Sequence, residues 1–267
     1  MEPSTAVAAA TVPSPNTDLR FKFMRDIKTG GTDSSLTRVW IMENVFVVTG
    51  ASRGIGAATA ALAADAGYRV VRASRSAEES VGDRGWDARC DVSSWDSVQD
   101  LMARVESRWG RIDVVFANAG VSVDTSFVST AGAKPSEWTN MVVTNVCGPA
   151  FTARAAMPAL MRSGGHLVLT GSAAGRGVRP GNLYSATKWA VTGLAQAIRA
   201  EAVGTGVRVT VVQPGLVDTD AIPPSRADDP KLAPEDVGRA VLYAVSQPST
   251  VDVNEILIRP TGQAAHR

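Results

Sequence analysis

The sequence is poor in the residues on which several kinds of site depend. Among 267 residues there are two histidines and two cysteines. Cys90 and Cys147 lie far apart and form no C-x-x-C pair, which argues against a disulfide scaffold, a dithiol motif and a zinc site, and fits a reducing cytoplasm. His266 is next to last in the given sequence, and termini usually fray, while His166 begins an apolar run typical of a structural position. We therefore expect no metal site and no Ser-His-Asp triad.

An excess of one charge and long apolar runs are also missing. The chain has 27 Lys and Arg against 26 Asp and Glu, so a nucleic-acid or anionic-membrane partner is not indicated. No apolar run approaches the length of a membrane-spanning helix, and no secretory signal pattern opens the chain. The length suits one large domain with a well-buried core. The sequence thus predicts a cytoplasmic protein that acts on a small molecule.

Residues 1–41 differ from the rest in composition. This stretch is rich in Ala, Pro, Ser and Thr and has no sustained apolar period, so we expect a disordered extension before a single domain over 42–267. A transit peptide is the rival interpretation, but Glu2, Asp18 and Asp26 count against it. Met42 is a possible natural start.

From Val45 onward, short β-branched runs alternate with helical stretches. The apolar runs are 45–50, 68–74, 86–92, 112–120, 165–172, 207–215 and 254–260, and the helical stretches are about 54–66, 94–109, 136–162, 182–203 and 234–247. Continuous apolar strands separated by helices are typical of a parallel sheet covered on both faces. We expect an α/β fold: a single-domain, doubly wound Rossmann sheet with helices on both faces.

A glycine-rich turn, "TGASRGIG" (49–56), follows the first predicted strand and opens the first helix. Gly50 permits the turn, while Gly54 and Gly56 allow the backbone to approach a pyrophosphate and the helix to approach the strand. The helix N-terminus then presents free N–H groups to phosphates. Glycines also serve plain turns, but the strand–turn–helix context favours a dinucleotide site.

The end of the second predicted strand bears on the choice of cofactor. An acid there would bind the ribose 2′-OH of NAD, but the sequence is "RASRS", with Ser74 and Arg75. Arg53 in the glycine turn adds a second guanidinium, and two arginines suit a 2′-phosphate. The alternative is that Arg75 is a solvated charge. Asp91 in "CDV" and Asn118 in "ANAG" end the next two strands, where ligands of open α/β sheets bind.

The stretch "YSATKWAV" (184–191) has two interpretations. From Ser185 it is S-x-x-K, the spacing of an acyl-transfer serine, but that class expects S-D-N and K-T-G as well. S-D-N is absent, and the one K-T-G (28–30) precedes the fold. From Tyr184 it is Y-x-x-x-K, with Lys188 one helical turn away. A nearby ammonium lowers a tyrosine pKa, so Tyr184 is a candidate general acid/base, with Ser172 able to bond the substrate oxygen.

The glycine turn, "ANAG", Asn145, Ser172, "YSATK" and "PGLVDT" (214–219), in this order, resemble the classical short-chain dehydrogenase/reductase family. The likeness covers about Val45 to the C-terminus, and "VNEILIRPT" is similar to the branch of NADP-dependent 3-hydroxy acid and serine dehydrogenases. The resemblance implies an NADP(H)-dependent oxidoreductase that interconverts a secondary alcohol or hydroxy acid and a ketone or aldehyde, in a homodimer or homotetramer. The alternative is a non-catalytic NADP(H)-binding regulator or scaffold.

The family pattern implies residue roles as well. The implied catalytic residues are Asn145, Ser172, Tyr184 and Lys188. The implied cofactor-binding residues are Gly50, Ser52, Arg53, Gly54, Ile55, Gly56, Ser74, Arg75, Asp91, Val92, Asn118, Ala119, Gly120, Tyr184, Lys188, Pro214, Gly215, Val217 and Thr219. By the same resemblance, the Asn145 side chain holds a water for proton relay to Lys188, and Lys188 holds the nicotinamide ribose.

Two departures from the family pattern matter. Ala117 stands where the family usually has Asn, a mild change. The segment 220–234, "DAIPPSRADDPKLAP", is short and rich in proline, whereas the family has a substrate lid in this region. The short lid leaves the substrate class open.

Overall fold

The computed structural model describes residues 44–177, 180–220, 222 and 226–263. Contacts divide the chain into Met1–Ile41 and Met42–Arg267, and the fold belongs to the second unit. The expectation of a disordered extension over 1–41 concerns residues outside the described ranges.

An eight-stranded sheet forms the centre of this unit, with strand order β3-β4-β2-β1-β5-β6-β7-β8. Its strands are β1 (Val45–Thr49), β2 (Arg69–Ser74), β3 (Ser80–Val81), β4 (Gly85–Arg89), β5 (Val114–Ala117), β6 (His166–Thr170), β7 (Arg208–Pro214) and β8 (Glu255–Ile258). All neighbours pair in parallel except β3, which runs antiparallel to β4. The predicted doubly wound fold is confirmed, and the strand order reverses at β1, between β2 and β5.

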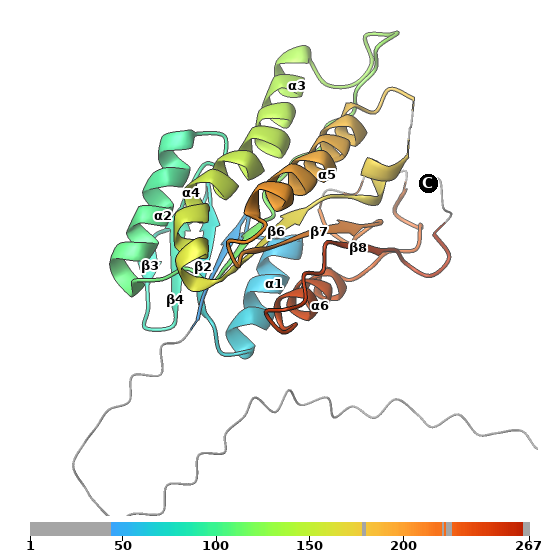
Figure 1. Cartoon of the computed structure of the whole chain (residues 1–267). Helices are drawn as coiled ribbons and strands as arrows, with labels where there is room; N and C mark the ends of the chain where they lie inside the picture. Colours follow the sequence, from blue (N-terminus) through green and yellow to red (C-terminus); the bar gives the residue numbers. More distant parts are fainter. Residues whose placement is uncertain (1–43, 178–179, 221, 223–225, 264–267) are drawn as a thin grey trace, which may run out of the picture. The chain divides into compact units, whose positions relative to one another are not determined.

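Helices cover both faces of the sheet (Figure 1). They are α1 (Gly54–Asp65), α2 (Trp95–Trp109), α3 (Pro135–Val142), α4 (Gly148–Ser163), α5 (Leu183–Ala202) and α6 (Pro234–Val245), with a π-helical turn over Val143–Cys147 and a 3₁₀ turn over Ala173–Arg176. One face carries α1 and α6, and the other carries α2, α4 and α5 (Figure 1).

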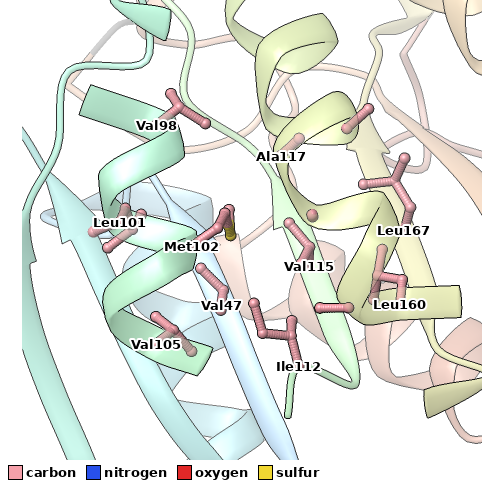
Figure 2. Close-up of a cluster of buried hydrophobic side chains, with 14 of the residues drawn as sticks. Val47, Val98, Leu101, Met102, Val105, Ile112, Val115, Ala117, Leu160 and Leu167 are labelled. Carbon is pink, nitrogen blue, oxygen red and sulfur yellow. The ribbon is translucent and has the colours of Figure 1, made fainter. Parts of the chain in front are cut away.

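Successive side chains along β1 point alternately to the two faces of the sheet, so the strand contributes to a hydrophobic cluster on each face. Phe46 and Val48 belong to the cluster under α1 and α6, while Val45 and Val47 belong to the cluster under α2, α4 and α5. Figure 2 shows the second cluster, where the side chains of Val98, Leu101, Met102 and Val105 on α2 point towards the strands. Burial of both faces explains the continuous apolar runs of the inner strands.

The ends of two helices follow the local signals in the sequence. Ser94 caps α2 by accepting a hydrogen bond from the Ser97 N–H (3.3 Å), and Gly110 ends it with a φ of 71°. Pro234 opens α6, where the Asp236 carboxylate accepts from the Ala233 N–H (2.8 Å).

Three expectations for the strands were wrong in detail. The two-residue edge strand β3 is absent from the prediction, since both its residues are exposed and carry no apolar pattern. The strand predicted over 86–92 ends at Arg89, because Asp91 turns the chain by accepting from the Ser93 N–H (3.0 Å). Edge strand β8 has exposed or half-buried residues rather than two buried faces.

The helix predicted over 136–162 is interrupted at Val143–Cys147 by the π-helical turn. Pro149 has no N–H, so the carbonyl of Asn145 cannot receive its α-helical hydrogen bond. The Gly148 N–H instead donates to the Val143 carbonyl, five residues back. Pro149 therefore interrupts the α-helical hydrogen bonding at Asn145, which is a predicted site residue. Such π-helical turns are often found at functional sites.

His166 is structural, as expected from its place at the start of β6. Its Nε2 lies 2.7 Å from Thr210 Oγ1, and that hydroxyl donates to the Val253 carbonyl (2.5 Å). The Thr210 hydroxyl has used its one hydrogen, so it must accept a hydrogen bond from the His166 ring. Nε2 therefore carries the single N–H hydrogen of a neutral imidazole. Burial, with a smaller effect of Arg208, lowers the pKa of His166 to about 3.

This pKa predicts a loss of stability in acid. Between pH 6.5 and about 3 the unfolded chain binds a proton at His166 and the folded chain does not. The free energy of unfolding should therefore fall with decreasing pH, by about 1.4 kcal/mol per pH unit from this group alone. Urea unfolding at pH 7, 6 and 5 measures it. His166→Gln retains a donor for Thr210 and should show a shallower slope; equal slopes would contradict the assignment.

Candidate active site

The predicted site segments meet at the carboxyl ends of the central strands. Gly50 turns the chain after β1 with a φ of 67°, and a Cβ there would lie 2.7 Å from Ala119 Cα. A Cβ on Gly56 would lie 2.2 Å from the Gly50 carbonyl oxygen and 2.6 Å from Asn118 Nδ2. Gly54, with a φ of 55°, faces the Thr219 methyl group. Any side chain at these glycines would fill the turn.

The first turn of α1 suits phosphate groups. It contains no acidic residue, and its N-cap residue, Arg53, makes no side-chain cap. The N–H groups at this end are therefore not occupied by a capping side chain, and the helix dipole favours an anion there. The close-packed glycine turn and this helix end fit the pyrophosphate of a dinucleotide.

Asn118 joins the ends of three strands. Its Nδ2 donates to the carbonyls of Thr49 (3.1 Å) and Gly50 (3.2 Å), and its Oδ1 accepts from Thr170 Oγ1 (3.2 Å). Both amide hydrogens thus serve the fold, while its predicted part in cofactor binding stays a prediction.

Two other predicted cofactor residues turn their side chains into the core. Ile55 packs with the cluster under α1 and α6. Val92 is buried beside Gly148, at which a Cβ would lie 3.0 Å from the Val92 methyl group. A contact of either residue with a cofactor would have to come from its backbone.

Predicted cofactor-binding residues line two pockets beyond β2 and β4. Arg75 and Asp91 line an open pocket of about 450 Å³ together with Arg89 and Ser97. Burial raises the pKa of Asp91, but hydrogen bonds from Ser93 and the charge of Arg75 outweigh it, so the net direction is down. The Asp91 carboxylate is thus ionised at neutral pH.

Ser52 and Ser74 line the second pocket, of about 150 Å³. The sequence interpretation missed Arg89. Its signal was its place at the carboxyl end of β4, the edge at which ligands of open α/β sheets bind.

Arg53 does not line either pocket. Its Nη1 lies 3.3 Å from Asp220 Oδ2, and both side chains are exposed. The sequence placed Arg53 with Arg75 at the ribose, and the structure gives the two arginines different neighbours.

Tyr184 and Lys188 lie one turn apart near the start of α5. Asn182 caps this helix by accepting from the Ser185 N–H (2.9 Å). The Lys188 side chain is buried, 4% exposed, and its Nζ donates to the Thr170 carbonyl (2.8 Å). The same Nζ lies 5.6 Å from the centre of the Tyr184 ring. Burial lowers the pKa of Lys188 to about 8.

Ser172 is the polar group that acts on the pKa of the Tyr184 phenol. Burial raises the pKa of Tyr184, and the hydrogen bond with Ser172 offsets part of this rise. The direction is opposite to the one expected from Lys188, whose Nζ donates to the Thr170 carbonyl instead. Ser172 has extended backbone and accepts from the Ala174 N–H (3.1 Å) at the start of the 3₁₀ turn. The phenol is therefore protonated at neutral pH, as a general acid must be.

The Asn145 side chain is held by two other segments of the chain. Its Oδ1 accepts from the Val121 N–H (2.8 Å), and its Nδ2 donates to the Val121 carbonyl (2.8 Å) and to Thr187 Oγ1 (3.1 Å). Both amide hydrogens are used, so a relay water at this side chain would have to donate to Oδ1, and the relay role of Asn145 stays a prediction. Asn145 lies beside Lys188 all the same: a Cβ on Gly120 would meet Asn145 Oδ1 at 3.3 Å and Lys188 Nζ at 3.6 Å.

Thr187 was missed by the sequence interpretation. It is buried, accepts from Asn145 and donates to the Tyr184 carbonyl (2.7 Å). It thus links Asn145 to the turn that carries Tyr184. A threonine inside a helix gives no local signal of such a contact.

Ser185 has no counterpart to these contacts. Within the described ranges its Oγ is buried and makes no hydrogen bond. Lys188 Nζ bonds to Thr170 rather than to Ser185. The S-x-x-K interpretation thus has no geometric support.

The segment after β7 approaches the glycine turn. The Gly215 N–H donates to the Ile258 carbonyl (2.7 Å), and Val217 forms an isolated bridge with Leu232. Pro214 is the last residue of β7, and Thr219 touches Gly54. Of the short lid predicted over 220–234, residues 221 and 223–225 lie outside the described ranges.

A model of the short chain dehydrogenase family matches residues 44–230. This chain belongs to the short-chain dehydrogenase family. It is 37% identical over 232 residues to an uncharacterized oxidoreductase of Staphylococcus aureus (strain N315), covering 82% of this chain and 98% of the relative. The protein is therefore an oxidoreductase of this family, and its site is that of a nicotinamide dinucleotide.

Solved structures of short-chain dehydrogenases are also similar. An alcohol dehydrogenase of Thermococcus sibiricus, complexed with 5-hydroxy-NADP, has a TM-score of 0.74 at 30% identity, over 83% of this chain and 98% of its own. A serine dehydrogenase of Escherichia coli has a TM-score of 0.72 at 29% identity, over 82% and 99%. A 3-ketoacyl-(acyl-carrier-protein) reductase of Brucella melitensis, complexed with NADH, shares the fold with a TM-score of 0.71 at 24% identity, over 82% and 98%.

The described residues offer neither a membrane-spanning helix nor a cluster of metal ligands. None of the helices in those ranges is both long and apolar enough to span a bilayer. Nor do three His, Cys, Asp or Glu side chains there gather where they could hold a metal ion.

Proposed function

We propose that this short-chain dehydrogenase is an NADP(H)-dependent oxidoreductase that interconverts a secondary alcohol or hydroxy acid and the corresponding ketone or aldehyde. The observation that carries the proposal is the group of Ser172, Tyr184 and Lys188. The Ser172 hydroxyl acts on the pKa of the Tyr184 phenol, and the buried Lys188 ammonium lies 5.6 Å from the centre of the phenol ring. A protein that only binds a dinucleotide has no use for Ser172, Tyr184 and Lys188 together, and a buried ammonium is costly to place in a folded core.

In this proposal Tyr184 is the general acid for carbonyl reduction and the base for alcohol oxidation. A bound nicotinamide supplies or accepts the hydride. The Tyr184 phenol gives its proton to the carbonyl oxygen, and the Ser172 hydroxyl donates a hydrogen bond to the same oxygen. The Lys188 ammonium stabilises the phenolate left behind. Asn145 and Thr187 connect the first turn of α5, which carries Tyr184, to the chain at Val121.

NADP(H) is the proposed cofactor because no acid ends β2. Ser74 occupies that end and Arg75 follows it, next to a pocket that Arg89 also lines. A guanidinium forms charge-assisted hydrogen bonds with phosphate. The related alcohol dehydrogenase with 5-hydroxy-NADP supports the same choice, and the serine dehydrogenase relative supports a hydroxy acid among the substrates to test.

Arg75→Ala should weaken NADPH binding by about 10- to 100-fold, the usual effect of losing hydrogen bonds to a charged group. The dissociation constant for NADH should stay within about twofold, because NADH has no 2′-phosphate. Calorimetric titration of both cofactors measures the change. Arg239→Ala, which removes an arginine of α6 paired with Asp236, is the control. An equal loss for both cofactors would contradict the role of Arg75.

The proposed activity is tested by a screen of aldehydes, ketones, hydroxy acids and sugars for NADPH oxidation or NADP⁺ reduction. We expect turnover with at least one member and weaker binding of NADH than of NADPH. Tight NADPH binding without turnover would support the non-catalytic binding protein instead.

The setting of the proposed activity is also part of the proposal. Both cysteines are free thiols, which supports a cytoplasmic protein. Trp189 on α5 is 46% exposed, which supports a contact with a second copy in a homodimer or homotetramer.

A further inference from the structure

An ion pair joins the glycine turn to the segment that follows β7. Arg53 Nη1 lies 3.3 Å from Asp220 Oδ2. The two residues are 167 positions apart in the chain. The contact therefore exists only because the segment after β7 lies over the start of α1, where Gly54 faces Thr219.

The surroundings of the pair are those of an anion site. Arg53 is the N-cap residue of α1, and the first turn of that helix contains no acid. A guanidinium and a helix N-terminus both favour a negative group. Asp220 supplies that group from within the chain. Two other carboxylates of this region, Asp218 and Asp229, have cationic partners of their own in Lys231 and Arg226.

A carboxylate and a phosphate monoester are alternative partners for one guanidinium, since both present paired oxygens to its N–H groups. The 2′-phosphate is the one charged group that NADP(H) has and NAD(H) lacks. An acid that already occupies the arginine must be displaced by that phosphate, whereas a cofactor without the phosphate leaves the ion pair intact.

We propose that Asp220 is a specificity-determining residue, whose carboxylate competes with the 2′-phosphate of NADP(H) for Arg53. The proposal rests on the proposed preference for NADP(H) and adds a residue that limits it. Asp220 lowers the affinity for the phosphorylated cofactor and leaves the affinity for NAD(H) unchanged.

The size of the effect follows from exposure. The side chains of Arg53 and Asp220 are 73% and 75% exposed. Exposed ion pairs are weak, so Asp220→Asn should tighten NADPH binding by about two- to fivefold at low salt. The gain should shrink as salt screens the pair.

The experiment is a calorimetric titration of NADPH and NADH into the full chain and four variants. Asp220→Asn should lower the dissociation constant of NADPH alone. Asp229→Asn, an acid-to-amide change in the same segment, should alter neither constant. In the Arg53→Ala background, Asp220→Asn should have no effect, because the group for which Asp220 competes is gone.

Three results would overturn the proposal. An unchanged NADPH constant in Asp220→Asn shows that the pair does not compete. An equal gain for NADH shows that the 2′-phosphate is not involved. A gain that persists with Arg53→Ala shows general repulsion by the acid rather than competition. A wild-type chain that binds no NADPH would instead contradict the proposed function, and the role of Asp220 would fall with it. The failure of the proposed function is therefore distinguishable from the failure of the Asp220 proposal alone.

Discussion

Tyr184→Phe should reduce kcat/KM for carbonyl reduction by about 10²- to 10⁴-fold, the range of a lost general acid. The substitution removes the phenolic oxygen and keeps the ring, so packing against Lys188 and the start of α5 is retained. The dissociation constant of NADPH should stay within about twofold. Stopped-flow kinetics and a cofactor titration on the same preparation measure both quantities.

Ser185→Ala is the matched control for this variant. Ser185 is the next residue of α5, and its buried hydroxyl makes no hydrogen bond among the described residues. The rate of Ser185→Ala should equal that of the wild type. Turnover of Tyr184→Phe at the parental rate would refute the role of Tyr184, and loss of activity in Ser185→Ala would revive the acyl-transfer interpretation.

Lys188→Met should lower kcat by about 100-fold or more while leaving the fold intact. Methionine fills a similar volume but removes the charge that would stabilise a Tyr184 phenolate. The Lys188 ammonium that the substitution removes is buried and has a pKa of about 8. Its charged form is therefore costly in the folded state. We therefore expect the free energy of unfolding to stay within about 1 kcal/mol of wild type at pH 7, or to rise.

The pH dependence of stability separates these two effects of Lys188. Between pH 8 and 10.5 the unfolded chain holds a proton at Lys188 that the folded chain has lost. Wild-type stability should therefore rise with pH across this interval, and Lys188→Met should lack that rise. Urea unfolding at pH 7, 8 and 9 provides the comparison. A variant that is markedly less stable at every pH would mean that Lys188 supports folding rather than proton transfer.

Local patterns were enough to predict the layers and most element ends. Apolar runs separated by helical stretches predicted the doubly wound sheet, and Ser94, Gly110 and Pro234 marked helix ends because capping depends on a few adjacent residues. Edge strand β3 and the π-helical turn escaped prediction. The first is too short to show a period, and the second depends on a proline four residues beyond Asn145.

The composition and ordered motifs of this chain are sufficient for its class of chemistry. Scarce His and Cys, a glycine turn after the first strand, and Tyr184 with Lys188 at helical spacing each depend on residue type and short-range spacing alone. Such features restrict which groups are present and which neighbours along one helix they can have. They therefore predict a dinucleotide-binding oxidoreductase before any long-range contact is known.

Only the tertiary structure supplies the neighbours of each group. The Asn145 side chain binds Val121 and Thr187, and Lys188 donates to Thr170. Arg53 meets Asp220 rather than lining a pocket with Arg75. These partners come from different strands and helices, brought together where the strand order reverses. Hydrogen bonds and pKa values depend on such neighbours and on burial, and neither is encoded within any one segment of the chain.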